Sequence, residues 1–575
     1  MRLLLSGNAA ARGSALGRAR VRLPHALEVE ESRIEAAEVD AEIARVHEAV
    51  DAVRAEMHAL RERLHGALAH EVGEFLDLHA LLLDDPELLQ GVDALIRTGL
   101  YTAPYALRLQ RNRIAAVFEG MDDDYLRSRI DDIDQVIGRL NAALHRRHAD
   151  LQGVSGEVLV TDNIAPAELA QLQSQGVVGV VTSAGSPLSH SAILARSLHL
   201  PLVVGAAQAL QKINDGDVLV VDGGSGLLIR EPNAADLREH RQRVADARRE
   251  RQQLNRLRRE PSRTRDGIDI KLWANAESRE DVTDAHALGA AGVGLFRTEY
   301  LYLGSERLPD EETQFRAYRD AVIAMTGRTV TFRTVDLGAD KADRTGLVLK
   351  DEPNPALGLR GVRLSLARAG LLHSQLRAIA RASGYGPVRV LVPMVSGAEE
   401  MRGVHIALGA VLRELREEGH ATADKIPLGA MIEVPSAALA LPAFIELCDF
   451  LSIGTNDLVQ YLLAADRTNE ALDELYTPLH PAVVRLLRDI ARTAARRDIP
   501  LSVCGEIAGD PLFVPMLLAL GVGELSLHPG TMLEVRRAIR SVDLSALRAA
   551  APALLRARDR AGIERWLAAH SAPVA

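Results

Sequence analysis

The sequence contains only two cysteines in 575 residues, Cys448 and Cys504. This excludes a disulfide framework and is typical of a protein kept in a reducing cytoplasm. No window reaches about 18 uninterrupted apolar residues, which excludes a transmembrane helix. The apolar run at the N-terminus is too short for a signal peptide. We therefore expect a cytoplasmic protein without membrane insertion.

Lysine is also scarce, because only five of the 68 basic residues are lysines, and Lys341 is one of them. The 78 acidic residues outnumber the basic ones, giving a net charge of −10. No basic tract stands out, which argues against a nucleic-acid partner. The hydrophobic fraction of 47% predicts ordinary globular cores, and the length allows several domains.

The first 230 residues predict an α/β domain interrupted by helices. Strand-like runs near the N-terminus return after residue 157, whereas the intervening residues have helical apolar spacing with breaks near Gly66, Pro86, Gly99 and Gly120. We expect an α/β domain formed by 1–28 and 148–232, an all-α insertion at 29–147 and a solvated linker helix at 233–262.

From residue 263 to the end, strands and helices alternate. Eight such units over this length predict a (β/α)₈ barrel, also called a TIM barrel. Amphipathic stretches that follow the strands include 280–288, 314–324, 372–382 and 481–495. The strand candidates are 268–275, 292–297, 329–336, 388–394, 427–434, 450–454, 501–505 and 523–527.

One histidine, His190, lies in a segment that favours bound negative charge. Gly185 and Pro187 break the chain, Ser189 is a candidate N-cap, and 191–198 has the spacing of a short helix. His190 would lie in the first turn, where free N–H groups and the helix dipole attract anions. No second ligand stands at metal-binding spacing, so the pattern indicates a nucleophile. A histidine that only caps or packs a helix gives the same local pattern.

Polar and charged residues follow the predicted barrel strands at the ends where barrel enzymes carry their active sites. Arginines and a lysine there suit an anion with several charged oxygens. Carboxylates are hard ligands suited to Mg²⁺, and a thiol can move a proton. Each residue alone has an ordinary structural interpretation, and the argument for a site is their coincidence at one barrel mouth. The set is Arg297, Arg333, Asp336, Lys341, Glu433, Asn456, Asp457, Arg467, Cys504 and Glu506.

Longer segments match a known family. They include FRTVDLGADK (332–341), DEPNPALGLRGVR (351–363), SIGTNDLVQY (452–461) and VCGEIAGD (503–510) in the barrel, and EFLDLHALLLDDPEL (74–88) in the helical region. Together they resemble enzyme I of the phosphoenolpyruvate-dependent sugar phosphotransferase system. The resemblance covers nearly the whole chain.

The resemblance implies a Mg²⁺-dependent transfer of a phosphoryl group from phosphoenolpyruvate to His190 and then to a histidine of the carrier HPr, with release of pyruvate. It also implies that the helical insertion docks HPr, that the barrel forms a homodimer, and that the N-terminal half swivels about the linker. The implied roles are phosphate binding by Arg297, Arg333 and Lys341; carboxylate binding by Asn456 and Arg467; Mg²⁺ binding by Glu433 and Asp457, the latter also at the substrate; protonation of the enolate by Cys504; and attack on phosphorus by Nε2 of His190.

Two positions near His190 depart from the family pattern. Leu188 replaces the threonine of the usual Gly-Gly-x-Thr-Ser-His, and a second threonine, expected about twenty residues upstream of the histidine, aligns near Leu169. The hydroxyl groups that usually attend the histidine are therefore missing.

Three alternatives remain open at this point. A pyruvate phosphate dikinase or phosphoenolpyruvate synthase shares the histidine and barrel modules, but it needs an ATP-binding domain, and the residues before His190 contain no glycine-rich phosphate loop. A regulatory enzyme I would use the same chemistry without sugar uptake. A non-catalytic scaffold would have lost the charged strand-end residues, and the principal ones are present.

Overall fold

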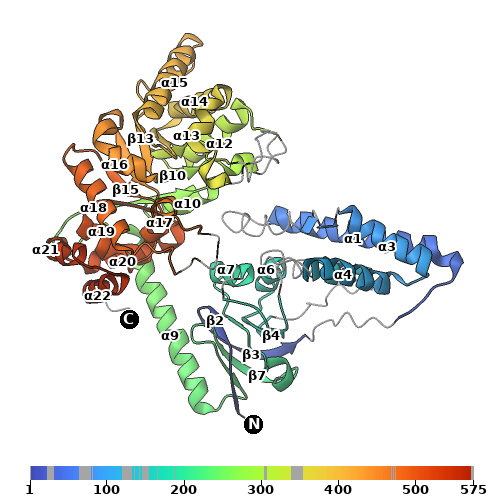
Figure 1. Ribbon diagram of the computed structural model, residues 1–575. Helices are drawn as coiled ribbons and strands as arrows, with labels where there is room; N and C mark the ends of the chain where they lie inside the picture. Colours follow the sequence, from blue (N-terminus) through green and yellow to red (C-terminus); the bar gives the residue numbers. More distant parts are fainter. Residues whose placement is uncertain are drawn as a thin grey trace. The chain divides into compact units, whose positions relative to one another are not determined.

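The computed structural model contains two units, Met1–Glu250 and Arg251–Ala575, coloured from blue to green and from green to red in Figure 1. No helix among the residues described is both long and apolar enough to cross a membrane. Leu188 and Lys341 lie outside the described residues. The structure describes residues 2–22, 31–63, 79–80, 82–83, 85–119, 133–134, 136–141, 143–144, 155–164, 166–187, 189–303, 307–338, 352, 354–467, 469, 472 and 474–571.

The first unit is built on an eight-stranded mixed sheet with the order β1-β8-β7-β3-β4-β5-β6-β2. β3, β4, β5 and β6 are parallel to their neighbours within this group, and the other four strands join antiparallel. The sequence pattern does not predict β2 or β8, and β2 consists of Asn-Ala-Ala-Ala, a composition with weak strand preference. The strands are β1 (Leu3–Ser6), β2 (Asn8–Ala11), β3 (Ser14–Val21), β4 (Glu157–Thr161), β5 (Gly179–Thr182), β6 (Leu202–Val204), β7 (Val218–Asp222) and β8 (Leu227–Arg230).

Several helices of this unit come from the segment between β3 and β4. α3 (Pro86–Gly99) begins and ends at two of the predicted breaks, and Asp85 caps its first turn by accepting a hydrogen bond from the N–H of Glu87. The predicted break at Gly66 lies outside the described residues. α1 (Val39–Arg63) and α4 (Ala103–Glu119) pack with α3, and their apolar faces share one core with one face of the sheet. Shorter helices are α6 (Pro166–Ser174), α7 (His190–Ser197) and α8 (Ala209–Lys212), and α9 (Ala234–Arg256) follows β8.

The second unit is a closed barrel of eight parallel strands, which confirms the predicted fold class. Each predicted strand segment overlaps one observed strand, and β9 extends one residue beyond its predicted segment. The strands are β9 (Lys271–Ala276), β10 (Val293–Arg297), β11 (Val330–Arg333), β12 (Val388–Val392), β13 (Leu428–Ile432), β14 (Phe450–Ile453), β15 (Leu501–Val503) and β16 (Glu524–Leu527). The helices are α10 (Arg279–Ala287), α11 (Tyr300–Leu303), α12 (Glu311–Ala324), α13 (Gly361–Ala367), α14 (Ala369–Ala382), α15 (Ala398–Glu417), α16 (Pro435–Phe444), α17 (Thr455–Leu463), α18 (Pro481–Ala495), α19 (Val514–Leu520), α20 (Met532–Ser541), α21 (Leu544–Leu555) and α22 (Arg560–His570).

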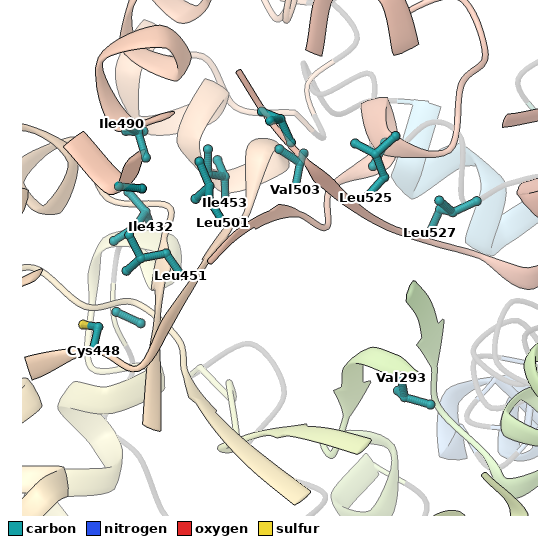
Figure 2. Close-up of a cluster of buried hydrophobic side chains, with 14 of the residues drawn as sticks. Val293, Ile432, Cys448, Leu451, Ile453, Ile490, Leu501, Val503, Leu525 and Leu527 are labelled. Atoms are coloured by element: carbon teal, nitrogen blue, oxygen red, sulfur yellow. The ribbon is translucent and has the colours of Figure 1, made fainter. Parts of the chain in front are cut away.

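Alternation along the strands separates the outer apolar layer from the barrel interior. Ile453 and Leu501 belong to the buried cluster that also contains Ile490 of α18, and Figure 2 shows these side chains. Burying one such side chain contributes about 1.5–3 kcal/mol. The neighbouring positions point inward, where the hydroxyl groups of Ser452 and Ser502 lie 3.1 Å apart. The interior is thus partly polar below the mouth.

Candidate active site

The local structure of the first unit places His190 at the start of α7 (His190–Ser197), as the sequence predicts. Ser189 is the N-cap, and its hydroxyl accepts a hydrogen bond of 3.3 Å from the N–H of Ala192. The Ser191 hydroxyl donates to the carbonyl of Ile164 at 2.6 Å, which ties the first turn to the segment after β4. His190 therefore lies at the positive end of a capped helix.

Leu169, near which the second threonine of the family pattern aligns, lies in α6 and is completely buried in the apolar core. The position is a packing position in this chain. Its burial explains how an apolar side chain is accommodated there.

The barrel brings most of the predicted strand-end residues to one mouth. Arg297 and Arg333 are the last residues of β10 and β11 and are register partners on these neighbouring strands. Glu433 and Cys504 directly follow β13 and β15, and Asp457 lies in the first turn of α17, just beyond β14. Since parallel barrel strands all end at the same face, these positions share that face.

Arg333 is held by buried carboxylates. Its Nη2 donates to Oε1 of Glu299 at 2.5 Å, and its Nη1 lies 3.8 Å from the Asp336 carboxylate. Glu299 Oε1 also accepts the N–H of Asp336 at 3.1 Å. Burial alone would lower the pKa of Arg333, but the charges of Glu299 and Asp336 outweigh it and raise the pKa. Arg333 is therefore a fixed positive charge at the mouth.

Arg360 joins the same cluster and was not selected from the sequence. Its guanidinium donates to both oxygens of Asp336, at 3.1 and 2.8 Å, and lies 3.9 Å from Asp457 Oδ2 and 3.4 Å from the hydroxyl of Tyr461. It belongs to the matched segment 351–363 but does not directly follow a strand. Only the resemblance to a known family could have drawn attention to it.

Glu433 and Asp457 are the two carboxylates that suit a cation. Glu433 is 1% exposed and accepts the N–H of Met394 at 2.6 Å. Burial, reinforced by the charges of Asp457 and Asp336, raises the pKa of Glu433 well above its usual range. Oδ1 of Asp457 is buried and accepts no hydrogen bond from the described residues, although Nη1 of Arg467 lies 3.5 Å away.

These two carboxylates fit a divalent cation, which would keep Glu433 ionised and bind the buried Asp457 oxygen. In the parts of the chain that the structure describes, no group of three or more acidic, histidine or cysteine side chains could hold a metal ion. A cation bound here would take further ligands from a substrate or from water, as Mg²⁺ commonly does.

Cys504 lies in the barrel interior beneath the charged residues. It is 3% exposed, packs with Met431 and Phe450, and donates from Sγ to the Ile453 carbonyl at 3.4 Å. Burial raises the pKa of Cys504 to about 11, so the group is a neutral thiol at physiological pH. A neutral thiol is able to donate a proton.

The other predicted residues that the structure describes also lie around the mouth. Asn456 donates from Nδ2 to Oε1 of Glu506 at 2.9 Å, and its Oδ1 accepts the Glu506 N–H at 3.1 Å. Arg467 is half-exposed and paired with Asp457. Arg297 donates to Glu277 at 2.8 Å. The mouth therefore combines Arg297 and Arg467, each of which is paired with a carboxylate, with the buried cluster around Arg333. This arrangement suits a multiply charged anion.

The fold and site define a phosphoenolpyruvate-utilising enzyme, and the chain belongs to that family. Models for its PEP-binding, N-terminal and mobile domains match residues 251–544, 6–129 and 153–226. The mobile-domain match contains His190, and the PEP-binding match contains the barrel mouth.

Relatives span almost the whole chain. A phosphoenolpyruvate-protein phosphotransferase of Cupriavidus necator is 42% identical over 552 residues, covering 94% of each chain. A protein of the same name from Geobacillus stearothermophilus is 38% identical over 508 residues, covering 88% of each. A solved structure described as an NMR solution structure of Enzyme I is 30% identical and covers 42% of this chain and 99% of its own, at a TM-score of 0.36.

Proposed function

We propose that this chain is a phosphoenolpyruvate-protein phosphotransferase that moves a phosphoryl group from phosphoenolpyruvate to His190. The observation that carries the proposal is the barrel mouth, where neighbouring arginines, a buried carboxylate pair and a neutral thiol meet at the ends of the strands. Family membership supplies the substrate class, because the matched barrel segment is a PEP-binding domain. The names of the relatives indicate that the acceptor of the phosphoryl group is a protein.

Under this proposal, each group at the mouth has a chemical role. Mg²⁺, when bound, would neutralise charge on the phosphate. The arginines bind and orient the anion because their planar guanidinium groups match its oxygens. The assignments are phosphate to Arg297, Arg333 and Lys341; the substrate carboxylate to Asn456 and Arg467; Mg²⁺ to Glu433 and Asp457, with Asp457 also next to the substrate.

The reaction balances with His190, Cys504 and one proton from water. Nε2 of His190 attacks phosphorus in line, and the bond between phosphorus and the enol oxygen breaks with its electron pair left on that oxygen. The carbonyl of pyruvate forms as the methylene carbon takes the proton of Cys504, and the thiolate regains a proton from water. The phosphoryl group remains on His190.

The proposal also assigns a role, and where it applies a partner, to each domain of the chain. We assign the histidine domain to 1–28 and 148–232, HPr docking to the helices of 29–147, the linker to 233–262, and both substrate binding and homodimer formation to 263–575. Transfer from His190 to a histidine of HPr would make this the first step of sugar uptake or of its regulation. The free thiols Cys448 and Cys504 suit the reducing cytoplasm.

Labelled phosphoenolpyruvate with Mg²⁺ tests the proposal. We expect an acid-labile, base-stable phosphoprotein that transfers its label to added HPr, and we expect His190→Ala to abolish labelling. His199→Asn is a matched control, because His199 is exposed nearby and asparagine tolerates its left-handed backbone (φ 54°). Label that persists in His190→Ala would refute the assignment, and labelling from ATP instead would indicate a dikinase.

A further inference from the structure

A buried glutamine lies behind the barrel mouth on the otherwise apolar inner face of α14. Gln375 is completely buried among Leu372, Leu376 and Ile379. A buried amide costs free energy unless its donors and acceptor are paired. At Gln375 all of them are paired, and two of the three hydrogen bonds lead toward the site.

The amide holds the backbone between Arg333 and Asp336. Its Oε1 accepts the N–H of Val335 at 2.9 Å. Its Nε2 donates to the Thr298 hydroxyl at 2.9 Å, and that hydroxyl donates to the carbonyl of Arg333 at 2.8 Å. The segment has left the strand at this point, since β11 ends at Arg333. These bonds hold the backbone beyond the end of β11, where the Thr334 N–H still donates to the Leu391 carbonyl of β12 at 2.9 Å.

We propose that Gln375, acting with Thr298, is a positioning residue for the reaction with phosphoenolpyruvate. It fixes the backbone that carries Arg333 and Asp336, and so places the guanidinium of Arg333 against the transferring phosphoryl group. The inference rests on the proposed function, because Arg333 is assigned to the phosphate there. Gln375 itself does not need to touch the substrate.

Gln314, which belongs to the same group of hydrogen-bonded side chains as Gln375, provides a matched control. This glutamine is also completely buried, and its Oε1 accepts the hydroxyls of Tyr302 and Tyr318 at 3.1 and 3.2 Å. Its Nε2 donates to the carbonyl of Pro309 at 2.9 Å. Gln314 thus makes three hydrogen bonds as Gln375 does, but none of them reaches the segment from Arg333 to Asp336.

The test compares Gln375→Met with Gln314→Met in the full chain, with phosphoenolpyruvate and Mg²⁺. Both variants should unfold at a lower temperature. We expect Gln375→Met to lower kcat about 10- to 100-fold with a smaller change in KM, because a misplaced charge is felt most in the transition state. Gln314→Met should keep kcat within about twofold. Equal kcat values in the two variants would overturn the proposal.

If Gln375→Met does not fold, two variants of Thr298 test the proposed positioning role instead. Thr298→Val removes the hydroxyl at nearly constant volume and should lower kcat in the same way, whereas Thr298→Ser keeps the hydroxyl and should restore it. Unchanged kcat in a folded Thr298→Val variant overturns the inference while labelling of the wild type still supports the proposed function. A wild-type chain that takes no label from phosphoenolpyruvate overturns both.

Discussion

Replacement of Cys504 by alanine tests the proton-donor role of the thiol. The pKa of Cys504 is raised to about 11, so at pH 7.5 only about one molecule in three thousand carries a thiolate. The group is therefore almost always able to donate. Loss of a positioned acid costs a factor of about 10²–10⁴ in rate, equivalent to about 3–5 kcal/mol of barrier. We expect kcat for pyruvate formation to fall by that factor.

Cys448 provides the control for the loss of a buried sulfur. It is also 3% exposed, and burial raises the pKa of its thiol to about 12, but it packs in the outer apolar layer and does not face the barrel interior. Each truncation to alanine should destabilise the fold by about 1 kcal/mol through the small cavity it leaves. Only the variant at Cys504 should also lose activity.

The assay measures pyruvate formation under saturating phosphoenolpyruvate, together with thermal unfolding of both variants. The rate of the wild type should fall as the pH rises toward 11, because the thiol must be protonated to act. A folded Cys504→Ala variant with kcat within about threefold of the wild type would refute the assignment. An equal loss of kcat in Cys448→Ala would also refute the assignment, because the effect would then come from packing.

Two further predictions concern the charges at the mouth. Because burial raises the pKa of Glu433, the stability that its protonated form contributes is lost as the pH rises from the unfolded value through the folded one. Metal-free Glu433→Gln should therefore unfold at a higher temperature than the wild type at pH 7.5, and the difference should shrink toward pH 5; thermal scans showing a pH-independent difference would contradict this. Arg360→Lys should lower kcat/KM about 10- to 100-fold, because an ammonium cannot replace the paired hydrogen bonds to Asp336. The exposed Arg402→Lys should leave steady-state kinetics unchanged, and equal kinetics in both variants would show that pairing is unimportant.

The barrel could be predicted from the sequence because its periodicity is local. Strands of three to six mostly apolar residues alternate with amphipathic helices, and α18 is found at the residues predicted for it, Pro481–Ala495. Arg297, Arg333, Glu433 and Cys504 followed from one rule, since residues after parallel strands share one face of the barrel. Position along a strand was enough to find them.

The partners of these residues could not be found in this way. Arg360 and Asp336 are 24 residues apart, and no spacing rule pairs a loop arginine with a strand-end carboxylate. Gln375 is a single polar residue within a helical pattern, which sequence alone cannot distinguish from a solvent-facing position. Its burial, and the direction of its hydrogen bonds, appear only when α14 is packed against β11.

The buried charges at the mouth also bear on how a metal ion and substrate would bind. Among the described residues, the guanidinium groups of Arg333, Arg360 and Arg467 pair with the carboxylates of Glu299, Asp336 and Asp457, so the charges of this set balance. Ionisation of Glu433 would add a negative charge close to those of Asp457 and Asp336, and burial together with these two charges raises its pKa. A proton and a divalent cation would therefore compete for this carboxyl group. Binding of Mg²⁺ would release the proton and leave the mouth with a net positive charge, which suits a trianionic substrate.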